Sequence, residues 1–174
     1  MSQYSNHSAT PSGGPCAPRI QPSMTQQSLM KNPVSLRCDL HGTVQELPAF
    51  FERLEAWAQA ADLPAGPVAK FSLMLDELLT NVAMHAYANE GGPVSVAVEF
   101  VAPHTLQSVI RDQGPAFDPT RLAAPDLNMA MEERGIGGLG VHFVRRLADS
   151  FSYRRDGGYN EVTLDYSLVG NNSR

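Results

Sequence analysis

Apolar residues recur every three or four positions along two stretches in the first half of the chain. One stretch spans residues 67–88 and has no proline or glycine after its first position. Its apolar side chains share one helical face: Val68, Phe71, Leu75, Leu78, Leu79 and Val82. This spacing predicts a helix with one buried side, with Pro67 in its first turn.

A second helix is predicted over residues 43–61. Thr43 is placed to cap its first turn with Glu46 three residues later, and Pro48 marks the start of its regular part. Trp57 is expected to pack in the core rather than to serve as a stacking platform, because it shares the apolar side with Leu47, Phe50, Phe51, Leu54 and Ala58.

Alternation of side chains between two faces predicts strands over residues 34–40 and 94–100 and in a terminal hairpin formed by residues 151–155 and 160–168. Residues 105–111 follow a turn at Pro103-His104 and are predicted to form the returning antiparallel strand, with Leu106, Ser108 and Ile110 on one face. A third helix is predicted over residues 141–148, directly after a run of glycines. The pattern therefore gives a count of helices and strands but not their connectivity.

Composition limits the classes of protein that fit. The chain has 174 residues, 43% of them hydrophobic and 18% charged, which suits one globular domain with a core. Its net charge of −5 and its lack of a basic tract argue against a nucleic-acid binder. Its apolar runs are too short to cross a bilayer and its N-terminus has no signal-peptide pattern, so we expect a cytoplasmic protein without membrane contact. Cys16 and Cys38 have neither metal-site nor disulfide-framework spacing.

The two ends of the chain differ from its middle. Residues 1–32 are rich in Ser, Pro, Gln, Asn and Gly and contain few large apolar side chains. Such a segment cannot bury enough surface to offset its chain entropy. We predict a disordered N-terminal tail over residues 1–32, one domain over residues 33–169 and a frayed end over residues 170–174.

A first polar signal lies within the helix predicted over residues 67–88. Glu77 and Asn81 are four residues apart, so both project from one side of that helix, beside its buried stripe. An amide oxygen can ligate Mg²⁺, and a carboxylate can accept a proton from an attacking hydroxyl. The pair taken alone also suits an ordinary solvated helix surface.

A second signal follows a predicted strand, where Asp112 ends the strand and Gly114 comes two residues later. An ionised Asp at the floor of a pocket can accept a hydrogen bond from an exocyclic amine such as adenine N6. A glycine lets the main chain approach a flat ring closely. The alternative is a loop built from ordinary loop residues.

A third signal is the run Arg134-Gly135-Ile136-Gly137-Gly138-Leu139-Gly140, which leads directly into the third predicted helix. Free amides and the positive end of the helix dipole suit phosphate oxygens at such a position, and Arg134 can add a charged fork. The run is not a P-loop, because no Gly-Lys-Ser/Thr follows it. It does not fit the dinucleotide fingerprint either, because no short strand precedes it.

In this order the three signals resemble the N-box helix, the Asp-x-Gly loop and the glycine-rich lid of the GHKL ATPase superfamily. The chain is most similar to the RsbW-type anti-sigma-factor serine/threonine kinases, through its compact length, its run from Asn81 to His85-Ala86-Tyr87 and its lack of a phosphoacceptor helix pair. The resemblance covers about residues 34–168. It implies an α/β two-layer sandwich, the Bergerat ATP-binding fold, in which helices cover one face of a mixed, mostly antiparallel sheet.

The resemblance also implies roles for individual residues. Glu77 would be the base that activates a protein serine, and Asn81 would hold the Mg²⁺ that bridges the phosphates of ATP. Asp112 would bind the adenine amine, with Gly114 beneath the ring. His85 matches a position that is commonly His in this group, and we expect it to pack at the edge of the cleft.

The glycine-rich lid would bind the phosphates. Arg134 and the amides of residues 135–140 would face the phosphate oxygens. One extra glycine in residues 137–140, compared with the shorter loop common in the family, leaves the register of these contacts open.

The implied partners are a STAS-type anti-sigma-factor antagonist, whose serine is phosphorylated, and a sigma factor. Members of the family often dimerise, so a homodimer is a further expectation. Two other functions stay open: a nucleotide-dependent protein-binding switch without catalysis, and a histidine-kinase ATPase domain that acts in trans. Against the latter stand the missing phosphoacceptor helices and the short segment between the Asp-x-Gly loop and the lid.

Overall fold

The computed structural model of the protein describes residues 35–101, 103–122 and 138–169, which all lie within one compact unit, Asn32–Arg174. The predicted disordered tail and the predicted frayed end lie outside the described residues, so both stay predictions. None of the described helices combines the length and the apolar character needed to span a membrane.

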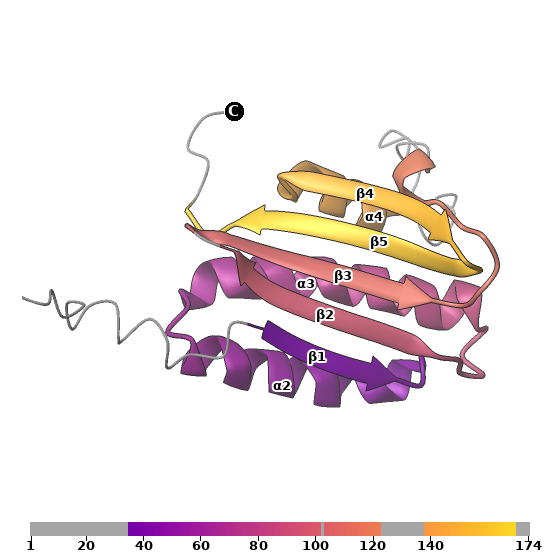
Figure 1. Ribbon diagram of the computed structural model, residues 1–174, viewed down its shortest axis with the longest axis horizontal. Helices are drawn as coiled ribbons and strands as arrows, with labels where there is room; N and C mark the ends of the chain where they lie inside the picture. Colours follow the sequence, from indigo (N-terminus) through magenta and orange to yellow (C-terminus); the bar gives the residue numbers. More distant parts are fainter. Residues whose placement is uncertain (1–34, 102, 123–137, 170–174) are drawn as a thin grey trace, which may run out of the picture. The chain divides into compact units, whose positions relative to one another are not determined.

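Five strands form one sheet in the spatial order β1-β2-β3-β5-β4, and all four pairings are antiparallel (Figure 1). The strands are β1 Ser35–Leu40, β2 Val94–Val101, β3 Thr105–Asp112, β4 Ser150–Asp156 and β5 Tyr159–Ser167. Gly157 and Gly158 join β4 to β5 with φ values of 55° and 87°, which glycine adopts without strain in a tight hairpin turn. Because β5 lies between β3 and β4, Asp112 pairs with Asn160.

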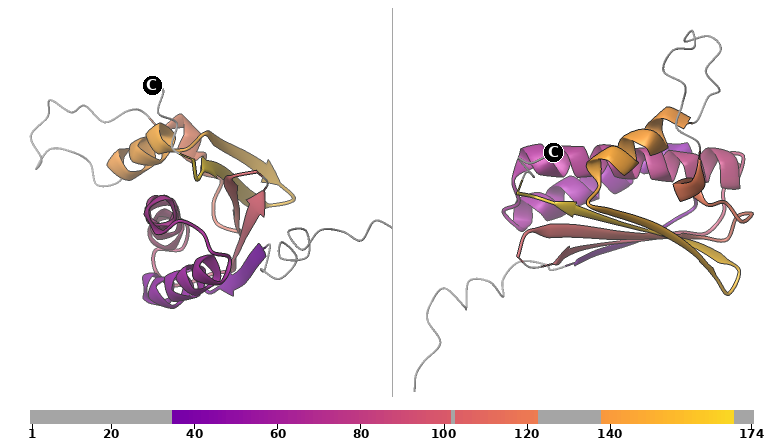
Figure 2. Two further views of the ribbon diagram at one scale, coloured as in Figure 1. Left: turned by 90° about the vertical axis from the view of Figure 1, so that its left-hand side faces the viewer. Right: turned by 90° about the horizontal axis from the view of Figure 1, so that it is seen from above.

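In the described part of the chain, the α-helices α2, α3 and α4 cover one face of this sheet, as Figure 2 shows. They are α2 Leu47–Ala60, α3 Ala65–Asn81 and α4 Gly138–Leu147. The core between the two layers includes the fully buried side chains Phe50, Leu54, Phe71, Leu75, Val96, Val98, Ile110, Val144 and Leu164, and Trp57 is buried with them. The predicted two-layer α/β sandwich is confirmed, although every pairing in the described part of the sheet is antiparallel rather than mixed.

The start of α2 differs from the predicted capping arrangement. Thr43 makes no side-chain capping hydrogen bond, and a 3₁₀ turn, η1 (Val44–Glu46), precedes the helix. Glu46 Oε2 instead accepts a hydrogen bond from the backbone N–H of His41 at 2.6 Å. The predicted capping pair is therefore wrong, because the carboxylate binds the turn before the helix.

Both ends of α3 also differ from the predicted helix. The helix begins at Ala65, two residues before Pro67, and a proline fits there because the first-turn N–H groups have no intrahelical partner. After Asn81 it widens into the π-helical turn η2 (Val82–Ala86), which the sequence pattern did not indicate. Such turns insert an extra residue and often occur at functional sites.

The opposite face of the sheet is polar, and its charged side chains pair with one another. Arg111, Glu161 and Arg154 lie next to each other on neighbouring strands. Glu161 accepts a hydrogen bond from Arg154 Nε at 2.6 Å and lies 3.3 Å from Arg111 Nε. The hydrogen bond from Arg154 lowers the pKa of Glu161. Arg37 and Glu99 form a further pair at 2.9 Å, so this face satisfies much of its own charge.

Candidate functional site

A cavity of about 180 Å³ lies where α3 and η2 meet the sheet and the loop after β3. Its lining is mostly apolar and includes the polar side chains of Asn81, His85, Asp112 and Asn160. Pockets that enclose a whole drug-sized ligand measure roughly 300–1,000 Å³. This cavity therefore has room for only part of a larger ligand, such as a flat ring.

Asp112 lies in the wall of this cavity and is only 4% exposed. Its Oδ1 accepts hydrogen bonds from the Gly114 N–H and from Asn160 Nδ2, each at 2.8 Å. Both of these bonds go to the same carboxylate oxygen. Oδ2 can therefore accept a hydrogen bond from a donor in the cavity.

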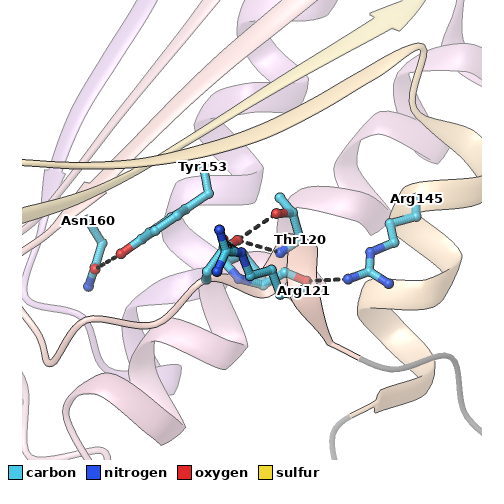
Figure 3. Close-up of polar contacts among 7 residues, drawn as sticks. Thr120, Arg121, Arg145, Tyr153 and Asn160 are labelled. Atoms are coloured by element: carbon cyan, nitrogen blue, oxygen red, sulfur yellow. Dashed lines mark hydrogen bonds and ion pairs between the residues drawn. The ribbon is translucent and has the colours of Figure 1, made fainter.

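Asn160 fixes this end of the site, and it was missed at the level of the sequence. It is 3% exposed, and its Nδ2 also donates to Pro115 O at 2.9 Å. Its Oδ1 accepts hydrogen bonds from the Tyr153 hydroxyl at 2.8 Å, drawn in Figure 3, and from Arg155 Nη1 at 2.7 Å. The β4–β5 hairpin thus holds the loop that follows β3.

Gly114 is enclosed between this network and η2. Arg155 Nη1 donates to its carbonyl oxygen at 2.8 Å. A Cβ placed on Gly114 would lie 2.5 Å from the Cβ of Ala86, so a larger residue would displace the loop or the π-turn. Close packing against η2 is enough to require glycine at this position, and its predicted place beneath a ligand ring stays a prediction.

Tyr87 braces the same loop from the end of η2. Its hydroxyl donates to Pro93 O at 2.9 Å and accepts a hydrogen bond from the Gln113 N–H at 2.8 Å. Burial raises the pKa of Tyr87. A Cβ on Gly92 would overlap the tyrosine ring, so glycine is needed beside it.

Glu77 does not line the cavity but lies one helical turn before Asn81, about 6 Å along the helix axis. Its carboxylate contacts Gly140 in the first turn of α4, where an added Cβ would overlap Glu77 Oε2. The free amides of a first helical turn and the positive end of its dipole favour an anion. Adjacent turns of α3 therefore reach the cavity and the N-terminal end of α4.

Arg145 joins α4 to the wall of the cavity. Its guanidinium donates to Leu122 O at 2.6 Å and to Pro119 O at 2.9 Å. Pro119 opens the 3₁₀ turn η3 (Pro119–Arg121) and also lines the cavity. Asp118 caps that turn by accepting a hydrogen bond from the Thr120 N–H at 2.9 Å.

The structure gathers part of the predicted site in one place. Asn81 and Asp112 line the cavity, and Gly114 lies beside Asp112. Glu77 and Gly140 meet next to it. His85 is exposed and lines the cavity.

The glycine-rich run is described only in part. Gly138 and Leu139 belong to the first turn of α4, so the helix begins inside the predicted loop rather than at residue 141. Arg134, Gly135 and Gly137 lie outside the described residues. Their contacts with phosphate stay predictions.

The donor set suits a metal ion that arrives with a ligand. In the parts of the chain that the structure describes, no group of three or more His, Cys, Asp or Glu side chains could hold a metal. Mg²⁺ commonly takes one or two protein ligands and completes its shell with phosphate oxygens and water. Asn81 lines the cavity and can offer its amide oxygen as such a ligand, and its Nδ2 is buried without a hydrogen-bond partner in the described residues.

Comparison of the sequence with known proteins identifies its family. The sequence profile described as histidine kinase-like ATPase domain matches residues 40–166. The chain belongs to this family. The serine/threonine-protein kinase BtrW of Bordetella bronchiseptica is 34% identical over 100 residues, which cover 55% of this chain and 68% of BtrW.

A solved structure supports the fold of this family member. The RsbU and RsbW domains of Rv1364c from Mycobacterium tuberculosis match it with a TM-score of 0.55 at 15% identity. The match covers 76% of this chain but only 32% of that longer chain. At this identity the likeness is one of fold.

Proposed function

We propose that this protein is an ATP-dependent serine/threonine kinase that phosphorylates a serine of a small STAS-type anti-sigma-factor antagonist, and that it regulates a sigma factor by partner switching. The observation that carries the proposal is the placement along α3: Asn81 faces the cavity that holds Asp112, and Glu77 meets the first turn of α4. The similarity to the serine/threonine-protein kinase BtrW supports a serine or threonine hydroxyl as the acceptor of the phosphate group. ATP and sigma factors are cytoplasmic, so the proposal places the protein there.

The cavity would take the adenine ring of ATP. Asp112 Oδ2 would accept the hydrogen bond from the exocyclic amine, while Oδ1 stays bonded to the Gly114 N–H and Asn160. The apolar walls formed by residues such as Leu78 and Val162 would contact the ring faces. Guanine would present a carbonyl to the carboxylate, so this arrangement favours adenine.

The phosphates would extend from the cavity toward the N-terminal end of α4. First-turn amides at Gly138, Leu139 and Gly140 would hold phosphate oxygens, with Arg134 and the amides of Gly135 and Gly137 from the preceding run. Asn81 would ligate the Mg²⁺ bridging these phosphates, and the bound ion supplies charge neutralisation. Glu77 would orient the serine hydroxyl and accept its proton as the hydroxyl oxygen attacks the terminal phosphorus.

The proposal is tested by phosphate transfer. The full chain is incubated with Mg²⁺, radiolabelled ATP and STAS-type proteins encoded by the same genome, each paired with its Ser→Ala variant. We expect acid-stable label on one wild-type antagonist and none on its Ser→Ala variant. Label that survives alkali but not acid would indicate phosphohistidine and contradict the proposal, as would the absence of label on every candidate.

A prediction concerns Asn160. Asn160→Ala is expected to lower the free energy of unfolding by about 2–3 kcal/mol, because it leaves buried donors and acceptors around Asp112 and Pro115 without partners. ATP affinity is expected to fall as well, because the loop and Asp112 Oδ1 lose their anchor. Urea denaturation and calorimetric titration measure the two effects.

The control for this prediction is Gln107→Ala. Gln107 makes a hydrogen bond to Asp165 on the polar face of the sheet, away from the cavity. We expect the free energy of unfolding to fall by about 1 kcal/mol or less and the ATP affinity to stay unchanged. Equal losses for the two variants would show that Asn160 has no special role in the site.

A further inference from the structure

A second hollow lies between α2 and α3, away from the cavity around Asp112. It is a groove of about 710 Å³, and it shares no lining residue with the cavity around Asp112. Its apolar side chains include Phe51, Leu63, Val68 and Leu73. Leu73, in the middle of α3, is 47% exposed.

The charged groups of the groove are all acidic. Glu52, Glu55 and Asp76 line it, and no Lys or Arg is among the lining residues. None of the ion pairs in the described residues involves these three carboxylates, and Glu55 only accepts a hydrogen bond from Gln59 at 3.3 Å. The polar face of the sheet differs, because its charges pair with one another. The groove thus combines exposed apolar surface with unpaired negative charge.

The shape of the groove fits a helix. Along α3 the lining runs from Ala65 to Asp76, about 16 Å or three helical turns. Two adjacent helices that present an apolar channel commonly accept the apolar face of a third helix. Basic residues flanking that face would pair with the carboxylates.

We propose that this groove docks a helix of a partner protein whose apolar face is flanked by Lys or Arg side chains. A second copy of this chain docking groove to groove would bring like charges together. An anionic membrane surface would be repelled by the same carboxylates. The partner helix would lie on the outer side of α3, while Glu77 and Asn81 act on its other side.

The test uses the full chain and a synthetic amphipathic peptide of about 14 residues with a Leu face flanked by Lys. Two comparison peptides have Glu in place of Lys, or the same composition in shuffled order. Fluorescence anisotropy is expected to give saturable micromolar binding of the Lys peptide at low salt, with about tenfold weaker binding of the other two. Amide chemical-shift changes are expected to centre on Glu52, Glu55 and Leu73.

Variants distinguish peptide binding in the groove from non-specific electrostatic binding to an acidic protein. Leu73→Ala is expected to weaken binding about fivefold through lost apolar contact. Glu52→Lys is expected to weaken binding of the Lys peptide about fivefold and to strengthen binding of the Glu peptide. The matched controls are Val101→Ala, since Val101 is 41% exposed on β2, and Glu90→Lys after α3; both are expected to leave affinity within about twofold.

Several results would overturn the proposal: no saturable binding, equal effects of the variants and their controls, or chemical-shift changes outside α2 and α3. Self-association of the chain that Leu73→Ala abolishes would also overturn it, because a second copy would then fill the groove. ATP titrations on the same samples keep the two proposals apart. Absence of peptide binding with intact ATP binding rejects only the docking surface. Absence of ATP binding with intact peptide binding rejects only the nucleotide site.

Discussion

Replacing Asp112 by Asn is expected to weaken ATP binding about 100-fold while the fold stays intact. The new side chain keeps an oxygen that can accept from Gly114 N–H and Asn160, so the loop retains its anchors. Its nitrogen then points toward the cavity and meets the adenine amine donor to donor, at a cost of about 3 kcal/mol. Calorimetric titration with Mg²⁺ and ATP measures the loss.

The nucleotide preference gives this prediction a second readout. The Asn amide can donate to the ring carbonyl of inosine, so ITP should lose less affinity than ATP or should gain some. The control is Asp118→Asn, because Asp118 caps η3 in the same loop and is not among the cavity-lining residues. An Asp112→Asn protein that binds ATP as the wild type does, or an equal loss for Asp118→Asn, would contradict the assigned role.

The elements of the fold followed from the sequence because their signals are local. Apolar spacing in residues 43–61 and 67–88 identified α2 and α3, and alternation together with turn positions identified the five strands. The strand order could not be derived in this way. The position of β5 between β3 and β4 depends on packing between segments that the chain separates widely.

Two errors at helix ends have physical causes that the sequence pattern does not contain. Glu46 had the right spacing for a capping pair with Thr43, but the backbone of His41 competes for its carboxylate. The π-turn η2 was missed because its residues continue the apolar spacing of α3. In the structure its last residue, Ala86, packs closely against Gly114.

The residues of the candidate site also differ in whether local sequence could identify them. Asp112 and Gly114 were identified because both occur in one short loop, and Glu77 and Asn81 because they are one turn apart. Asn160 was missed because it lies in an ordinary alternating strand. Its role depends on the β3–β5 register that places it opposite Asp112, 48 residues away in the sequence.

Replacing Glu77 by Gln is expected to lower the rate of phosphate transfer about 10²- to 10⁴-fold, the usual contribution of a general base. Gln has nearly the same shape and should keep the contact with Gly140, but its neutral amide cannot accept the serine proton. ATP affinity should change little, because Glu77 lies outside the cavity that would hold the adenine ring. Single-turnover transfer to the antagonist and calorimetric titration separate the two quantities.

The comparison for Glu77→Gln is Glu90→Gln, which removes one carboxylate from the exposed turn after α3 and should leave transfer unchanged. If Glu77→Gln keeps wild-type transfer, another group removes the proton and the kinase mechanism proposed here is wrong. If neither Glu77→Gln nor Glu90→Gln transfers phosphate, but both variants bind ATP and the partner equally well, the family fold acts here as a nucleotide-dependent switch. A slow Glu77→Gln enzyme with normal ATP binding would leave the kinase as the explanation, because a binding switch has no transfer step for the carboxylate to accelerate.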